Sequence, residues 1–130
     1  MKAITATEIM ICDWVLDTTL NTPHRINAQD MYVAAEGILK LDAFQPIPLT
    51  PEILAKNGWE EDNIYADGTI RVFRQTFIDD LYSTTEIRID QDCYDDMHLM
   101  HEGKHFCFVN YVHQLQHALR LCQINKEIVL

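Results

Sequence analysis

The sequence is poor in the residues that interrupt regular structure. Its 130 residues include only four glycines and four prolines, which excludes long low-complexity linkers. No apolar run is long enough to span a bilayer, and Glu8 interrupts the only apolar stretch near the N-terminus. We therefore expect a cytoplasmic protein with neither a signal peptide nor a membrane partner.

Basic residues are also scarce. The chain has 10 Lys and Arg against 20 Asp and Glu, which gives a formal net charge of −10. Proteins that bind nucleic acid need a surplus of positive charge to neutralise phosphates. The composition therefore excludes nucleic acid as a direct partner, and its acidity indicates a well-solvated surface.

The motifs of common enzyme classes are missing. The four cysteines form no Cys-x-x-Cys pair, which argues against a zinc ribbon or a thioredoxin-like site. There is no Gly-rich phosphate loop and no nucleophile elbow. Ser83 is the only serine, which removes most serine-hydrolase mechanisms. We expect no catalytic residues and no cofactor.

Hydrophobic residues are plentiful, at 48% of the chain, and predict a real core in one domain over residues 1–130. A subdivision into a small β-subdomain (1–49) and a sheet with a C-terminal helix (50–130) is also compatible with the pattern. In the first part, residues 11–16, 24–28 and 31–35 are short runs typical of strands. They predict a small antiparallel sheet or open barrel.

Residues at both ends of segment 51–57 predict a short helix there. Thr50 suits the N-cap and Pro51 the first helical position. Gly58 can adopt the left-handed conformation that ends a helix. Beyond this helix the apolar pattern alternates with period two, at residues 70–77, 84–89, 96–101 and 104–109. Asp67 and Gly68 are typical of a hairpin turn before them.

These segments predict an antiparallel meander, and with the helices an α+β fold. Glu102 and Gly103 suit the loop of the last hairpin. A two-residue loop there would divide the hairpin into two faces. One face would carry Met97, Leu99, Phe106 and Phe108, and the other His98, Met100, His105 and Cys107.

A C-terminal helix begins near Tyr111, with Asn110 as its N-cap. Its apolar stripe is expected to pack on the sheet. The stripe comprises Tyr111, Val112, Leu115, Ala118, Leu119 and Cys122. The opposite side is expected to face solvent and carries His113, Gln116, His117 and Arg120. Leu121 also falls on this polar side, and the apolar tail 128–130 belongs either to the core or to an interface.

Histidines and Cys107 gather in the last third of the chain, and imidazole and thiolate are good zinc ligands. One candidate set is His98, His105 and Cys107, and another is His113 with His117. Gln114 stands where a zincin helix carries its Glu base, so hydrolysis is not supported. The simpler interpretation is a polar sheet face and a solvated helix face.

Three segments resemble one protein family. Residues 46–59 (PIPLTPEILAKNGW) are similar to an "IPLTxExLxxxG-aromatic" segment of small proteins from Bacteroides-type bacteria and their prophages and mobile elements. Residues 111–117 (YVHQLQH) resemble the "YVHQLQ" segment of those proteins, and residues 11–15 (ICDWV) resemble their early strand, with Cys12 in place of the usual Gly. The resemblance implies one intact domain and a gut-bacterial or phage-like origin, but no activity.

Three functional hypotheses remain open. The first is a non-enzymatic interaction or accessory protein of a mobile element or its host, with Leu121, Ile128 and Leu130 as candidate contacts for a protein partner or a second copy of the chain. The second is an acidic DNA mimic that binds a host nucleic-acid-binding protein. Its carboxylates would be Asp79, Asp80, Asp90, Asp92, Asp95 and Asp96. The third is a zinc-binding protein that uses the histidines above.

Overall fold

The protein has an α+β fold in which both sheets are antiparallel. The computed structural model describes residues 9–35, 44–62, 70–78 and 84–130. The chain divides into two compact units, residues 1–48 with 111–113 and residues 49–110 with 114–130. The single domain over residues 1–130, with a possible subdivision after residue 49, stays a prediction. The turn predicted at Asp67 and Gly68 lies outside the described residues.

The first unit contains a three-stranded sheet of order β2-β1-β3 and one helix. Its elements are β1 (Trp14–Asp17), β2 (Thr22–Arg25), α1 (Ala28–Ala35) and β3 (Phe44–Pro46). The sheet is open, so the first predicted alternative, a small antiparallel sheet, is confirmed, and the open barrel was wrong. A small core of Ile9, Val15, Ile26 and Phe44, joined by the partly buried Met31, holds the unit together.

The strand predicted at residues 31–35 was wrong, because these residues belong to α1. The start of the helix explains the difference. The N–H of Asp30 donates to Asn27 Oδ1 at 2.9 Å, and the N–H of Asn27 donates to Asp30 Oδ2 at 3.0 Å. This reciprocal capping satisfies two N–H groups at the helix start. It overrides the β-propensity of the apolar residues that follow.

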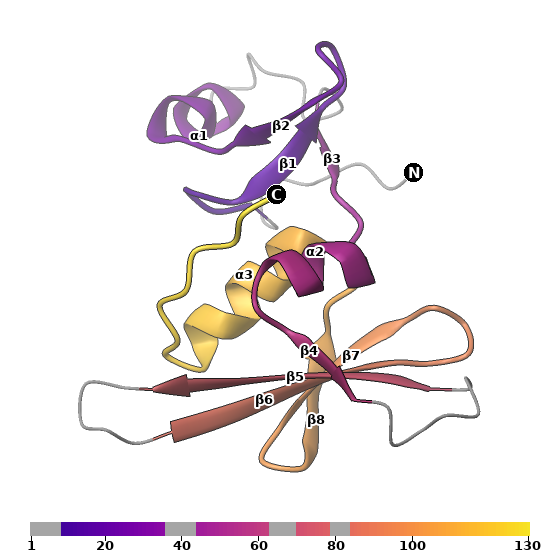
Figure 1. Cartoon of the computed structure of the whole chain (residues 1–130). Coiled ribbons are helices and arrows are strands. Elements are labelled where there is room, and N and C mark those ends of the chain that lie inside the picture. Colours follow the sequence, from indigo (N-terminus) through magenta and orange to yellow (C-terminus); the bar gives the residue numbers. More distant parts are fainter. Residues whose placement is uncertain (1–8, 36–43, 63–69, 79–83) are drawn as a thin grey trace. The chain divides into compact units, whose positions relative to one another are not determined.

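The second unit is built on a five-stranded sheet with the strands in sequence order, β4-β5-β6-β7-β8 (Figure 1). The order confirms the predicted meander. The strands are β4 (Glu60–Asp62), β5 (Arg71–Ile78), β6 (Thr84–Gln91), β7 (Met97–His101) and β8 (Lys104–Phe108). The helices are α2 (Pro51–Lys56) and α3 (Val112–Leu121).

Helix α2 confirms the prediction from its capping chemistry. Thr50 Oγ1 accepts a hydrogen bond from the N–H of Ile53 at 3.2 Å, and Pro51 occupies the first turn. Gly58 has a φ of +87° just beyond the helix end. The N–H of Trp59 then donates to the carbonyl of Leu54 at 3.0 Å, which turns the chain towards β4.

Helices α2 and α3 lie over one face of this sheet (Figure 1). The covered face contributes buried side chains such as Ile87, Ile89 and Leu99, and α3 contributes Leu115 and Leu119. Each such side chain stabilises the fold by roughly 1.5–3 kcal/mol when fully buried. The apolar stripe predicted for the C-terminal helix therefore does pack on the sheet.

The C-terminal tail is held by α2. The side-chain amide of Asn57 donates from Nδ2 to the carbonyl of Val129, and its Oδ1 accepts the N–H of Val129, both at 2.7 Å. The Lys56 ammonium donates to the carbonyl of Leu130. Ile128 is only 1% exposed, so it is one of the buried core residues of the chain. No helix in the part of the chain described here is both long and apolar enough to cross a membrane.

Candidate interaction surface

The β7–β8 hairpin carries most of the residues singled out by the sequence. Its loop is Glu102 and Gly103, with positive φ values of 54° and 76°, as a two-residue primed turn requires. His101 pairs with Lys104 directly before and after the loop. The predicted loop length is therefore confirmed.

The predicted faces of this hairpin are confirmed for β7 and for His105, but they were wrong for Cys107 and Phe108, because a β-bulge shifts the register. Met100 pairs with His105, but Leu99 pairs with Cys107, so Phe106 is an extra residue on β8. Beyond the bulge every side chain of β8 changes face. Cys107 therefore lies beside Leu99 on the covered face, and Phe108 lies opposite His98.

The candidate zinc ligands are consequently separated. His98 and His105 share a face, with ring centroids 5.2 Å apart, but Cys107 is on the other face. Burial raises the pKa of the Cys107 thiol, and the nearby Cys122 raises it further, which disfavours the thiolate that zinc needs. Within the four described stretches, no group of three or more His, Cys, Asp or Glu side chains is placed to hold a metal ion.

Helix α3 is buried over a wider arc than its apolar stripe predicts. His113 is 2% exposed and Gln116 6% exposed, although both were expected to face solvent. His117 is half-buried, and Leu121 is 73% exposed, on the side where the sequence placed it. His113 and His117 do lie one turn apart on α3, as predicted. Because His113 is buried and His117 is half-buried, they do not form an exposed pair of metal ligands.

The turn between β6 and β7 is organised by Asp92. Its Oδ1 accepts the N–H groups of Tyr94 and Asp96, at 2.8 and 3.0 Å, and its Oδ2 accepts Nε2–H of His98 at 2.7 Å. The His98 hydrogen bond holds the pKa of the Asp92 carboxyl below its ordinary value, and the two backbone hydrogen bonds add to the effect. Asp92 thus joins the turn to the exposed face of β7.

Asn110 closes the other end of the hairpin instead of capping a helix. Its Oδ1 accepts the N–H of Met97 at 2.7 Å, and its Nδ2 donates to Asp96 Oδ1 at 3.2 Å. Helix α3 begins only at Val112, whose N–H donates to the carbonyl of Ile47. The predicted N-cap role of Asn110 was therefore wrong, because its side chain is already used by the hairpin.

An aromatic cluster lies on the face of the hairpin away from Leu99 and Cys107. The ring of Phe108 is 4.7 Å from that of His98 and 5.2 Å from that of His105, measured between centroids. Phe108 is 50% exposed, and Tyr94, at the tip of the turn that Asp92 organises, is 83% exposed. We call His98, His105 and Phe108, together with Tyr94 of the adjoining β6–β7 turn, the hairpin aromatic surface.

Sequence patterns missed this surface. Phe108 was expected on the covered face with Met97 and Leu99, and only the bulge brings it to the exposed face. The sequence does not indicate the bulge, because its extra residue, Phe106, is not the glycine that often marks one. Tyr94 lies in a turn where the sequence pattern pointed only to the aspartates, Asp92, Asp95 and Asp96.

Of the interaction candidates named from the sequence, Leu121 is exposed, whereas Ile128 is buried and Leu130 is half-buried. The tail that contains the last two is tied to Asn57. Leu121 is therefore the one of the three with an open apolar side chain.

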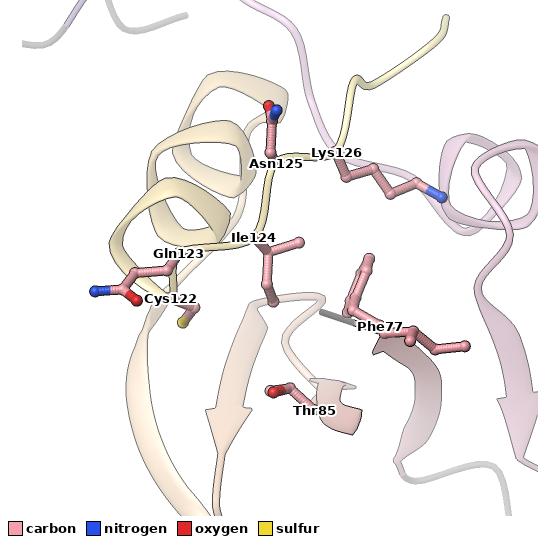
Figure 2. Close-up of a pocket in the computed structure, with 8 residues that line it drawn as sticks. Phe77, Thr85, Cys122, Gln123, Ile124, Asn125 and Lys126 are labelled. Carbon is pink, nitrogen blue, oxygen red and sulfur yellow. The ribbon is translucent and has the colours of Figure 1, made fainter. Parts of the chain in front are cut away.

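A cleft of about 490 Å³ opens between the ends of β5 and β6 and the segment after α3 (Figure 2). Its lining residues are Phe77, Ile78, Thr85, Cys122, Gln123, Ile124, Asn125 and Lys126. The Lys126 ammonium lies 5.9 Å from the centre of the Phe77 ring, and burial raises the pKa of the Cys122 thiol. These residues include no acid–base pair beside a nucleophile, so the cleft does not indicate catalysis.

Comparisons with known proteins give no match. No family model, no curated protein and no solved structure resembles the chain at a significant level. The resemblance to the Bacteroides-type family stays a prediction.

Proposed function

We propose that this chain is a non-enzymatic interaction protein, an accessory factor of a mobile element or its bacterial host. We assign the contact with its protein partner to the hairpin aromatic surface. The observation that carries the proposal is the exposure of two aromatic side chains: Phe108, 50% exposed, on the hydrogen-bonded β7–β8 hairpin, and Tyr94, 83% exposed, in the adjoining β6–β7 turn. Exposed tyrosine and other aromatic side chains are enriched where proteins bind one another.

The rigidity of the surroundings supports the same proposal. Phe108 lies on a strand paired with β7, and His98 is held by Asp92. Asn110 fixes the start of β7 by its hydrogen bond to Met97. A surface that is ordered before binding loses less conformational entropy when the partner arrives, which favours affinity.

The DNA-mimic hypothesis has weaker support. A mimic needs carboxylates that stand free like phosphates, but Asp90 lies 2.9 Å from the Arg88 guanidinium and Asp92 accepts from His98. Elsewhere on the sheet Glu61 is bound by Arg71 and Asp62 by Arg74. Asp79 and Asp80 lie outside the described residues. We therefore favour an aromatic protein contact.

Site-specific photocrosslinking tests the proposal. The variant Phe108→p-benzoylphenylalanine keeps a ring at the centre of the surface. In a lysate of the source cells, irradiation should give one dominant crosslinked band. The matched control is Leu20→p-benzoylphenylalanine, at a side chain that is 70% exposed in the first unit. The control should not give that band.

Two results would contradict the proposal. One is the absence of any crosslink at position 108 when the variant is folded and at its natural concentration. The other is the same band from positions 108 and 20, which would indicate general stickiness and not a defined surface. A band unique to position 108 supports the proposed contact.

A further inference from the structure

We propose that the partner segment bound by the hairpin aromatic surface is basic and presents arginine side chains to Tyr94 and Phe108. This inference rests on the proposed function and names the chemistry of its partner. It is carried by the charge of the chain, by the rings of the surface and by the carboxylates next to them.

The net charge of −10 favours a partner segment that carries positive charge. A strongly acidic protein attracts cationic segments over a Debye length and repels acidic ones. The hairpin aromatic surface adjoins an acidic turn that contains Asp92, Asp95 and Asp96, and Asp90 lies near the end of β6 just before this turn. Electrostatic complementarity therefore favours a basic segment at this edge of the sheet.

The rings of this chain already bind cations. The Arg25 guanidinium lies 5.2 Å from the centre of the Trp14 ring, and the Arg71 guanidinium 5.5 Å from that of Phe73. In the part of the chain that the structure describes, no such cation lies over Tyr94 or Phe108. A planar guanidinium can stack on an exposed ring while its N–H groups reach a nearby carboxylate.

The tip of the turn offers a ring and a carboxylate together. Tyr94 and Asp95 are adjacent and both exposed, and Asp95 has a φ of +65°, which shapes the tip. Asp92 and Asp96 instead use their carboxylate oxygens within the hairpin, towards His98 and Asn110. Asp95 is therefore the carboxylate best placed for an incoming arginine, with Tyr94 as the adjoining ring.

A second copy of the chain fits this surface less well. Each copy carries the charge of −10, so two acidic turns would be brought together. The bulge at Phe106 also interrupts the edge of β8, and bulged edges resist continuous pairing with another strand. Self-association through Phe108 is accordingly an outcome that would overturn the inference.

The test is an NMR titration of the full chain with two synthetic peptides of alternating sequence. One alternates arginine with serine, and the control alternates glutamate with serine. The arginine peptide should shift the amide signals of Tyr94, His98 and Phe108. Replacement of one ring, by Tyr94→Ser or Phe108→Ser, should weaken binding about threefold, as expected for one exposed cation–π contact. The glutamate peptide should not bind.

Two further variants complete the design. Leu20→Ser removes an apolar side chain that is 70% exposed in the first unit and should leave the affinity unchanged. Asp95→Asn should weaken binding about threefold and reduce its salt dependence, because one surface ion pair is lost. Because Tyr94 is highly exposed, Tyr94→Ser should leave the fold intact. The test therefore remains valid even if Phe108→Ser does not fold.

The inference is overturned if Tyr94→Ser binds the arginine peptide as tightly as the parent chain, since the attraction would then be only general charge. It is also overturned if the glutamate peptide binds equally well, or if sedimentation shows a dimer that Phe108→Ser dissociates. Photocrosslinking at position 108 separates the two proposals. A captured segment without basic residues would overturn the inference and leave the interaction function standing, whereas no capture would remove the function itself.

Discussion

The side chain of Asn57 forms two hydrogen bonds with the backbone of Val129, 72 residues further along the chain. Its Nδ2 also donates to the carbonyl of Ile53, in the last turn of α2, at 2.8 Å. One amide thus completes the end of a helix and holds the C-terminal tail in an extended segment. The buried Ile128 lies directly before the residue that Asn57 clamps.

Removal of this amide should destabilise the second unit. Asn57→Ala leaves the N–H and the carbonyl of Val129 without these partners, so we expect a loss of about 1–3 kcal/mol in the free energy of unfolding. Urea denaturation measures it. Asn125→Ala, at an exposed asparagine of the same tail, should change the stability by less than about 0.5 kcal/mol. Equal losses for the two variants would show that Asn57 does not hold the tail.

Two neighbouring tail residues should differ sharply in their contribution to stability. Ile128 is 1% exposed and Val129 is 54% exposed. Ile128→Ala should lower the free energy of unfolding by about 2–5 kcal/mol because it leaves a cavity in a packed core. Val129→Ala should have little effect, since its backbone makes the hydrogen bonds. Thermal or urea unfolding compares them, and a neutral Ile128→Ala would contradict the core position of the tail.

Asp92 should make stability depend on pH in the acid range. Its pKa is lowered in the folded state, chiefly by the His98 hydrogen bond, so the unfolded chain binds the proton first as the pH falls. The stabilisation is therefore complete above the ordinary value of 3.8 and is lost as the pH falls through the lower, folded-state pKa.

The measurement is the difference in urea midpoint between the parent and Asp92→Asn at several pH values. The difference in urea midpoint should be largest near neutral pH. It should disappear in acid, as the pH falls below the ordinary pKa of an aspartate. Asp95→Asn, at the exposed tip of the same turn, is the control and should show a gap that does not vary in this way. A pH-independent gap for Asp92→Asn would mean that the carboxylate charge does not stabilise the turn.

The two glycines with left-handed backbone should differ in their tolerance of a methyl group. Gly103 has a φ of +76° and open space where a Cβ would lie, so Gly103→Ala should destabilise by about 1 kcal/mol from backbone strain alone. Gly58 has a φ of +87°, and its added Cβ would lie 2.9 Å from Gln75 Nε2. Gly58→Ala should therefore destabilise more than Gly103→Ala in urea unfolding. Equal losses for the two variants would show that Gln75, a flexible side chain, moves aside without effect on stability.

Local chemistry made several elements predictable from the sequence. Thr50, Pro51 and Gly58 define α2, because capping and left-handed preference act over a few residues. Glu102 and Gly103 define the last hairpin loop for the same reason. The alternation of apolar and polar residues predicted the strands of the meander, because every second side chain of a strand points to the same, buried face.

Other elements depended on partners distant in the sequence or on competing local bonds. Helix α1 formed where a strand was expected, because Asn27 and Asp30 cap its start. Asn110 capped no helix, because Met97 and Asp96 use its side chain. The candidate zinc set was divided because one extra residue, Phe106, reversed the faces of β8.

The sequence by itself determined the fold class, the positions of α2 and the last hairpin loop, and the acidity of the chain. These properties follow from composition, periodicity and short-range backbone preferences. Only the tertiary structure decided that Ile128 belongs to the core and that Phe108 reaches the surface beside His98. Both depend on which backbone groups pair across the chain, and that pairing is a property of the whole fold.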